Sequence, residues 1–266
     1  MIMIICSVTS LPDRTNSLMG VLNSLLNSTI IPDKVIISVS EYYPRLNKKY
    51  DFKNLKLLRV FLENYKIPTE IFLYKKDVGP LLKLKSPMNY LASKKYNEEV
   101  LILTLDDDTL LYEKTIENIL VSQKKQEKAV YCLIGTKDDT FIHGETITTE
   151  TQVTGLGGYR GVLYNSKFLT KEFNHWIDFF IKKHQEENSI PMHDDHIFSW
   201  YFNKKNIPII VVPIPEKNKI SVINYIYCEN ADGIFRDKYS GYSLQLSEKI
   251  RKEILYNEKS SNHTLA

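Results

Sequence analysis

The sequence has few cysteines, and their placement excludes the protein classes that cysteine defines. Cys6, Cys132 and Cys228 are an odd number, and they lie far apart in a chain of 266 residues. We therefore expect neither a disulfide framework nor the paired spacing of a zinc site. Cys6 and Cys132 lie in apolar runs, as small hydrophobic side chains do. This cysteine usage is typical of a reducing compartment, so we expect a cytoplasmic protein.

Long apolar runs and a strong charge imbalance are also absent. No segment approaches the roughly 20 apolar residues of a membrane helix, so no membrane span is expected. The N-terminus MIMIICSV is short and lacks a basic region, which favours a first strand over a signal peptide. The formal net charge is +3, with lysines spread along the chain. That charge is too small to predict a nucleic-acid partner.

An alternation of strands and helices occupies the first part of the chain. The predicted strands are 2–8, 35–40, 70–76 and 100–105, and the predicted helices are 15–28, 55–65 and 88–97, the last after Pro87. Strands that alternate with helices indicate a mainly parallel sheet with helices on both faces. The regularity fades after about residue 155, although a helix is expected near 170–184 and a strand at 207–213. The fold class is therefore α/β, in a single Rossmann-like domain.

Polar clusters follow each of the first four predicted strands. They are TSLPDR, SEYYPR, DVGP and DDDTLL, in chain order. Ligands of open α/β sheets gather outside the carboxyl ends of the strands. We therefore expect the fold to bring the four clusters to one edge of the sheet.

Three adjacent aspartates end the apolar run of LTLDDDTLL. In extended chain Asp106 and Asp108 point the same way, and hard cations such as Mn²⁺ or Mg²⁺ prefer oxygen ligands, completed by water and substrate phosphates. This pattern favours a metal site at Asp106 and Asp108. Asp107 points elsewhere and could accept a ribose hydroxyl or position the loop. The alternative is that one aspartate caps a helix that begins near Thr109.

A second acidic cluster, HDDH, precedes an amphipathic stretch. Asp194 or Asp195 could cap a helix there, and a cap leaves one carboxylate over. A free carboxylate that faces a pocket is a candidate general base for a hydroxyl nucleophile. His193 and His196 could instead ligate a metal.

Basic and glycine-rich segments supply the remaining candidates. Arg14, Lys83 and Lys85 could neutralise a diphosphate, or the lysines could belong to a solvated helix edge. The segment GLGGYRG lacks the spacing of a dinucleotide fingerprint and does not open a helix after a first strand, which argues against nicotinamide binding. Its glycines could let the backbone approach a flat substrate such as a sugar ring, or form an ordinary tight turn.

Together these residues resemble a GT-A glycosyltransferase of the metal-dependent, DxD, family 2-like type, over roughly residues 2–212. The resemblance rests on Thr9 and Arg14 in TSLPDR, Asp77 in DVGP, Asp106 and Asp108 in LTLDDDTLL, Gly157, Gly158 and Tyr159 in GGYRGVLY, and the pair Asp194 and Asp195. In that family the counterpart of Asp77 often faces the nucleotide base. The second member of the acidic pair serves as the base in inverting enzymes.

The resemblance implies metal-dependent transfer of a sugar from a nucleotide-diphosphate sugar, with UDP favoured, to a hydroxyl of a glycan, lipid or protein side chain, with inversion. The expected donor contacts are Thr9, Arg14, Asp77, Lys83, Asp106 and Asp107. The expected metal ligands are Asp106 and Asp108, and the expected base is Asp195 or else Asp194. The expected acceptor contacts are Gly157, Gly158 and Tyr159. Residues 1–110 would bind the nucleotide sugar and 111–255 the acceptor.

The chain departs from the family pattern at two places. The usual acidic pair is glutamate then aspartate, so two aspartates leave the choice of base open. Many members add a C-terminal histidine as a metal ligand. Here the histidine after residue 196 is His263, within a polar tail at 256–266 that we expect to be disordered. The third metal contact is therefore open.

Two other functions fit parts of the pattern. A phosphatase of the haloacid dehalogenase type also places aspartates after a strand, but it needs threonine four residues after the first, where this chain has Leu110, with Thr109 one place early. A sugar- or nucleotide-binding module, or a degenerate transferase, would not require the second acidic pair.

Overall fold

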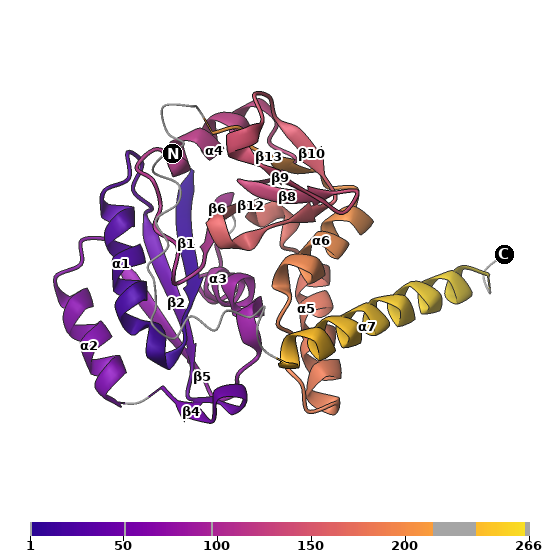
Figure 1. The fold of residues 1–266 in the computed structure, drawn as a ribbon, viewed down its shortest axis with the longest axis horizontal. Coiled ribbons are helices and arrows are strands. Elements are labelled where there is room, and N and C mark those ends of the chain that lie inside the picture. The colour runs from indigo at the N-terminus through magenta and orange to yellow at the C-terminus, as the bar shows by residue number, and fades with distance from the viewer. Residues whose placement is uncertain (1, 51, 97, 215–237, 264–266) are drawn as a thin grey trace.

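An eight-stranded sheet forms the centre of the protein (Figure 1). A computed structural model describes residues 2–50, 52–96, 98–214 and 238–263, so Cys228 lies outside the described part. Across the sheet the strands are β10 (Thr151–Val153), β13 (Ile209–Val211), β7 (Val130–Cys132), β12 (Val162–Asn165), β6 (Val100–Leu105), β1 (Met3–Thr9), β2 (Lys34–Ser40) and β5 (Thr69–Tyr74). Strands β10 and β12 run antiparallel to their neighbours, and the other pairings are parallel. The predicted mainly parallel sheet is confirmed.

Helices cover both faces of this sheet. They are α1 (Thr15–Leu26), α2 (Phe52–Glu63), α3 (Leu82–Ser93), α4 (Thr115–Lys125), α5 (Lys171–Glu186), α6 (Asp194–Lys204) and α7 (Lys238–His263). Apolar residues of α1, α2 and α4 form one core cluster, and those of α3, α5, α6 and α7 form the other. Within β1 the side chains alternate between the two clusters, Ile4 in the first and Ile5 in the second, as a strand covered on both faces requires.

Smaller elements lie outside the main sheet. Strands β11 (Gly155–Leu156), β8 (Ile134–Lys137) and β9 (Thr140–His143) form a second sheet, and β3 (Tyr42–Tyr43) pairs with β4 (Lys48–Lys49). The 3₁₀ turns are η1 (Pro12–Arg14), η2 (Pro44–Leu46), η3 (Gly79–Leu81), η4 (Gly144–Thr146), η5 (Gly158–Arg160) and η6 (Ser166–Phe168). Turns η1 and η3 lie in the loops that follow β1 and β5, and both contribute residues to the lining of the candidate site.

Two local predictions about helices need correction. Helix α3 begins at Leu82, before Pro87, which lies inside it. Proline removes one backbone hydrogen bond there, and the burial of Leu82 and Tyr90 against the sheet offsets that loss. No helix begins near Thr109, because the next helix, α4, starts at Thr115.

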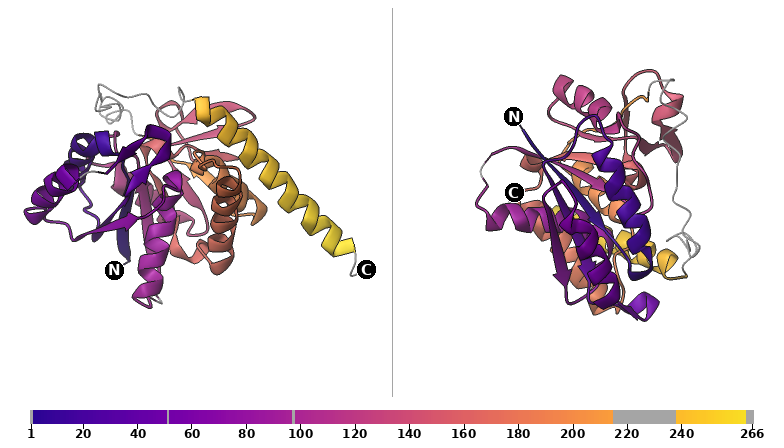
Figure 2. Two further views of the ribbon diagram at one scale, coloured as in Figure 1. Left: turned by 90° about the horizontal axis from the view of Figure 1, so that it is seen from below. Right: turned by 90° about the vertical axis from the view of Figure 1, so that its left-hand side faces the viewer.

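Helix α7 packs one end against the body and then extends away from it (Figures 1 and 2). Leu246 and Ile250 are buried in the second core cluster. The helix continues to His263, so the expectation of a disordered tail from residue 256 is wrong as far as that residue. Within the described residues, no helix has the length and apolar character needed to cross a membrane.

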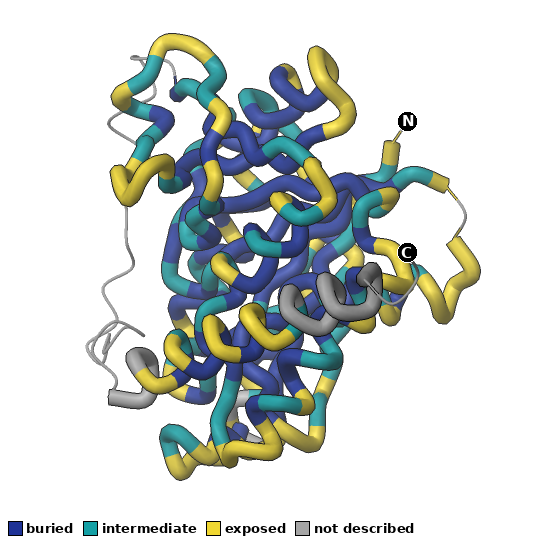
Figure 3. The backbone as a smooth tube through the Cα atoms, turned by 90° about the vertical axis from the view of Figure 1, so that its right-hand side faces the viewer, coloured by how far each residue is buried: buried dark blue, intermediate teal, exposed yellow. Residues whose placement is uncertain are grey.

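The burial of the backbone follows these layers (Figure 3). Every residue of β6 is buried, whereas α2 presents Leu57 and Val60 to solvent. A continuously buried strand that ends in three aspartates places those carboxylates at the boundary between core and surface. The candidate site is built at that boundary.

Candidate active site

A cavity of about 330 Å³ lies at the carboxyl ends of the parallel strands. Its lining includes the predicted residues Thr9, Arg14, Asp77, Lys83, Asp106, Asp107, Gly157, Tyr159, Asp194 and Asp195. Residues from all four polar clusters are present, so the expected convergence at one edge of the sheet is found. Asp108 and Gly158 are outside the lining and contact residues within it, Arg14 and Asp195 respectively. Lys85 points elsewhere and pairs with Asp178 on α5.

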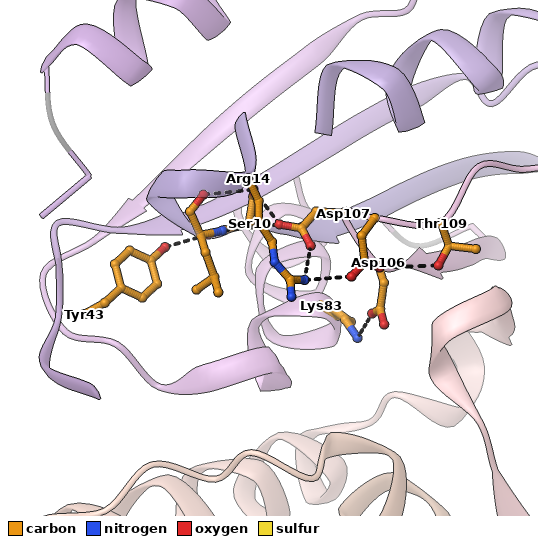
Figure 4. A network of polar contacts seen from close by, with 9 residues as sticks. Ser10, Arg14, Tyr43, Lys83, Asp106, Asp107 and Thr109 are labelled. Carbon is orange, nitrogen blue, oxygen red and sulfur yellow. Dashed lines mark hydrogen bonds and ion pairs between the residues drawn. The ribbon is translucent and has the colours of Figure 1, made fainter. Parts of the chain in front are cut away.

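The carboxylate of Asp107 forms hydrogen bonds with the loop that follows β1 and so fixes its position (Figure 4). It accepts hydrogen bonds from Ser10 Oγ at 2.7 Å, from the Leu11 amide at 3.3 Å and from Arg14 Nη1 at 2.9 Å. Burial raises the pKa of Asp107, and the Arg14 guanidinium and the Ser10 hydroxyl oppose that rise. Both carboxylate oxygens therefore have partners within the protein. Loop positioning is the role that the geometry shows, and the contact of Asp107 with a nucleotide stays a prediction.

Asp106 and Asp108 each lie beside a cationic side chain. Strand β6 ends at Leu105 and a turn follows, so the premise that these aspartates lie in extended chain is wrong. Asp106 Oδ1 is 2.5 Å from Lys83 Nζ, and Asp108 Oδ2 is 2.9 Å from Arg14 Nη1. Burial, and then repulsion by Asp106 and by the neighbouring aspartate, raises the pKa of Asp108 to about 6.

Lys83 joins the aspartates after β6 to the acidic pair of α6. Its Nζ lies 2.5 Å from Asp106 Oδ1 and 3.2 Å from Asp194 Oδ2, and its side chain is buried. Burial alone lowers the pKa of a lysine, but the surrounding carboxylates, Asp106 first, raise the pKa of Lys83 well above its usual value. Lys83 is thus a fixed positive charge shared by both acidic clusters.

Neither member of the acidic pair caps α6. The N-cap residue is His193, and Asp194 and Asp195 occupy the first two helical positions. Asp195 Oδ2 accepts a hydrogen bond of 2.8 Å from the Gly158 amide. Burial and the charge of Asp194 raise the pKa of Asp195 to about 8, while Lys83 and the Gly158 amide oppose the rise. The capping alternative is wrong, and both carboxylates are left for other contacts.

The histidines of HDDH line the same cavity. The rings of His193 and His196 stack with centroids 5.7 Å apart, and His196 also contacts Trp200. Burial lowers the pKa of His196. Across the ranges that the structure describes, no group of three or more histidine, cysteine, aspartate or glutamate side chains is arranged to hold a metal. Any metal set built from these residues would need ligands from water or substrate.

Two cavity residues escaped sequence reasoning. Arg45 Nε lies 3.3 Å from Asp77 Oδ2, and Arg45 Nη1 contacts Met192 Sδ. Burial raises the pKa of Asp77, and Arg45 opposes the rise. Tyr43 donates to the Ser10 carbonyl at 2.7 Å and so holds the loop after β1 from its other side. Both residues lie in SEYYPR, and the position of that segment after a strand was the available signal.

No known family model and no curated protein matches the sequence. Among solved structures, S. aureus TarS 1–349 aligns with a TM-score of 0.50 at 12% identity, over 80% of this chain and 59% of that one. TarS 1–349 in complex with UDP-GlcNAc aligns at 0.47 and 13%, over 75% and 53% of the two chains. A 4-diphosphocytidyl-2C-methyl-D-erythritol synthase aligns at 0.49 and 11%, over 82% and 91%.

The first of these likenesses defines the fold. The architecture shared with TarS 1–349 shows that this chain has a GT-A-like fold, as its motifs led us to expect. The chain spans 59% of the length of the TarS fragment that it matches. Because sites rather than folds decide chemistry, the activity depends on the residues that line the cavity.

Proposed function

We propose that the protein is a glycosyltransferase that moves a sugar from a nucleotide-diphosphate sugar, with UDP favoured, to a hydroxyl group. The main support is the double contact of Lys83, whose Nζ touches Asp106 and Asp194 at once. The contact places the aspartates after β6 and the acidic pair of α6 in one cavity. The reaction needs the leaving diphosphate of the donor and the base that deprotonates the acceptor on either side of a single sugar ring. The aspartates after β6 would serve the diphosphate, and the acidic pair of α6 would supply the base.

The donor would lie along the strand ends. Arg14 and Lys83 carry the positive charges suited to a diphosphate. Asp77 Oδ2 is buried without a hydrogen bond among the described residues, beside Arg45, so this pair could receive the donor and acceptor groups on the edge of a pyrimidine base. Thr9 lines the cavity at the end of β1, between the base and the diphosphate in this arrangement.

The residues fit a hard divalent cation such as Mn²⁺ or Mg²⁺. Asp106 and Asp108 offer only oxygen ligands, as these ions prefer, and one or two carboxylates suffice when phosphates and water complete the shell. Lys83 contacts Oδ1 of Asp106, and Arg14 contacts Oδ2 of Asp108. The second oxygen of Asp106 could therefore face a metal, and the second oxygen of Asp108 could do so beside its long hydrogen bond of 3.4 Å from the Thr109 hydroxyl. When bound, the cation would stabilise the negative charge of the departing diphosphate as a Lewis acid.

Asp195 is the proposed general base. It would take the acceptor proton while the acceptor oxygen bonds to the anomeric carbon and the bond from that carbon to the diphosphate oxygen breaks, with an oxocarbenium-like ring between. A pKa near neutrality suits a base, and the pKa of Asp195 is raised to about 8. Asp194 is the weaker candidate because its Oδ2 lies against the Lys83 ammonium. Attack opposite the leaving group inverts the anomeric centre.

A donor panel tests the proposal. The protein is incubated with nucleotide sugars and Mn²⁺ or with EDTA, the released nucleoside diphosphate is measured, and the product anomer is read by NMR. We expect Mn²⁺-dependent release with one donor class, loss of transfer in Asp195→Asn, and full activity in Asp178→Asn, whose carboxylate pairs with Lys85 outside the cavity.

Other outcomes identify the alternatives. Thermal stabilisation by UDP without turnover of any donor would indicate a binding module or degenerate transferase. Phosphate release from p-nitrophenyl phosphate would indicate a phosphatase. A product anomer that matches the donor would refute the role of Asp195 as the base of an inverting reaction.

A further inference from the structure

The start of α6 is joined to the glycine-rich segment by alternate backbone amides. The Leu156 amide donates to Ser199 Oγ at 3.0 Å, and the Gly158 amide donates to Asp195 Oδ2 at 2.8 Å. Ser199 Oγ in turn donates to the Asp195 carbonyl at 2.5 Å. The intervening Gly157 amide faces the other way and donates to the Ile134 carbonyl at 2.9 Å. This alternation directs the Gly158 amide at α6.

The carboxylate of Asp195 also occupies the space that a side chain at position 158 would need. A Cβ built on Gly158 would overlap Asp195 Oδ1 and lie 3.2 Å from Cγ and 3.4 Å from Oδ2. Gly158 opens η5 and is buried. Its φ is not in the left-handed region, unlike that of Gly161 at 105°. The nearness of the carboxylate, and not the backbone conformation, therefore disfavours a side chain at position 158.

We propose that Gly158 is a positioning residue for Asp195. Its backbone amide donates a hydrogen bond to the carboxylate, and its lack of a side chain leaves the space that the carboxylate occupies. The inference rests on the proposed function in that it takes Asp195 as the base. It gives a reason for glycine at this position that does not depend on the acceptor, because the carboxylate of Asp195 fills the space on the Cβ side of Gly158.

Such positioning has a direct catalytic consequence. The hydrogen bond at Oδ2 fixes the rotation of the carboxylate and leaves Oδ1 for an acceptor hydroxyl. Asp195 lines the cavity beside Gly157 and Tyr159, so a fixed Oδ1 would meet the acceptor in one orientation. Displacement of a catalytic group by about 1 Å can lower a rate by about 10²-fold.

A thermal double-mutant cycle tests the contact without any substrate. In the parent, Gly158→Ala should lower the Tm by about 3–6 °C, because overpacking strains the fold. In an Asp195→Ala background the methyl group meets empty space, and the loss should vanish. In Asp195→Asn, which keeps the shape of the carboxylate, the loss should persist. Equal losses in all three backgrounds would overturn the inference, because distant sites add and contacting sites couple.

Kinetics of the full chain then test the role. Gly158→Ala should keep the thermal stabilisation by UDP with Mn²⁺ and lower kcat/KM for transfer by about 10²-fold. The lost amide hydrogen bond should also move the acidic limb of the pH profile upward by about one unit, since that bond favours the ionised carboxylate. Full activity in Gly158→Ala, or an unshifted profile with reduced activity, would overturn the positioning role.

The two proposals fail in different ways. A coupled thermal cycle in a parent protein that turns over no nucleotide sugar would sustain the contact and refute the proposed function. An uncoupled cycle in a parent protein that transfers sugar would refute the positioning role and leave the proposed function standing.

Discussion

Replacing Asp195 by asparagine should stabilise the folded protein, and the gain should grow with pH. The pKa of Asp195 is raised to about 8 by burial and by Asp194, whereas an unfolded aspartate titrates near 3.9. Between these values the folded chain holds one more proton than the unfolded chain. The free energy of unfolding then falls as pH rises through that window. Asparagine keeps the size of the side chain and an oxygen for the Gly158 amide, and it removes the titration.

The expected magnitude follows from the one extra proton. One proton corresponds to about 1.4 kcal/mol per pH unit, so from pH 5 to pH 7 the wild type should lose about 3 kcal/mol relative to Asp195→Asn. Asp194 lies beside Asp195 and is also raised in pKa, chiefly by burial. The two titrate as a pair, and the proton that is counted belongs to that pair.

Urea unfolding of both proteins at pH 5, 6 and 7 measures this difference. Asp178→Asn is the control, because its carboxylate is half-exposed and pairs with Lys85 away from the cavity, and its difference from wild type should stay within about 0.5 kcal/mol. Parallel curves for wild type and Asp195→Asn would refute the reasoning, since they would mean that Asp195 ionises as an ordinary surface aspartate does.

Three further predictions concern activity and charge. The same titration predicts that kcat/KM for the donor rises about tenfold per pH unit below pH 8 and then levels off, so a flat profile from pH 6 to 8 would contradict the role of the base. Asp108→Asn should fold normally and lose the Mn²⁺-dependent thermal stabilisation by UDP; a retained shift would exclude Asp108 as a metal ligand. Lys83→Met should lower the free energy of unfolding by about 3 kcal/mol at pH 7, because Asp106 and Asp194 lose a buried partner. The more exposed Lys85→Met should cost less than about 1 kcal/mol in the same urea titration, and equal losses would argue against a special role for Lys83.

The first half of the fold was predictable because its strands are long and its apolar periods are clear. Strands β1, β2, β5 and β6 have six or seven residues each, enough to distinguish a strand from a helix. Strands β7 to β12 have two to four residues, too few to show a period. Several of them pair with strands that are distant in the sequence, as β12 pairs with β6 and β10 with β13. Local sequence does not encode those partners.

The location of the candidate site in the fold was predictable from the sequence, but most of the contacts within it were not. The strand-end rule located the acidic clusters, but the partners of Asp107 lie more than 90 residues away in the loop after β1. Three adjacent aspartates repel one another unless positive charge lies nearby, and from the sequence alone a metal was the predicted source of that charge. In the structure Arg14 and Lys83 already supply part of that positive charge.

A divalent cation would still have to neutralise the incoming diphosphate, because a further anion entering beside these carboxylates would otherwise meet net repulsion. Metal affinity should therefore depend on bound nucleotide more than on the protein alone, and weak Mn²⁺ binding without UDP agrees with this site rather than contradicting it.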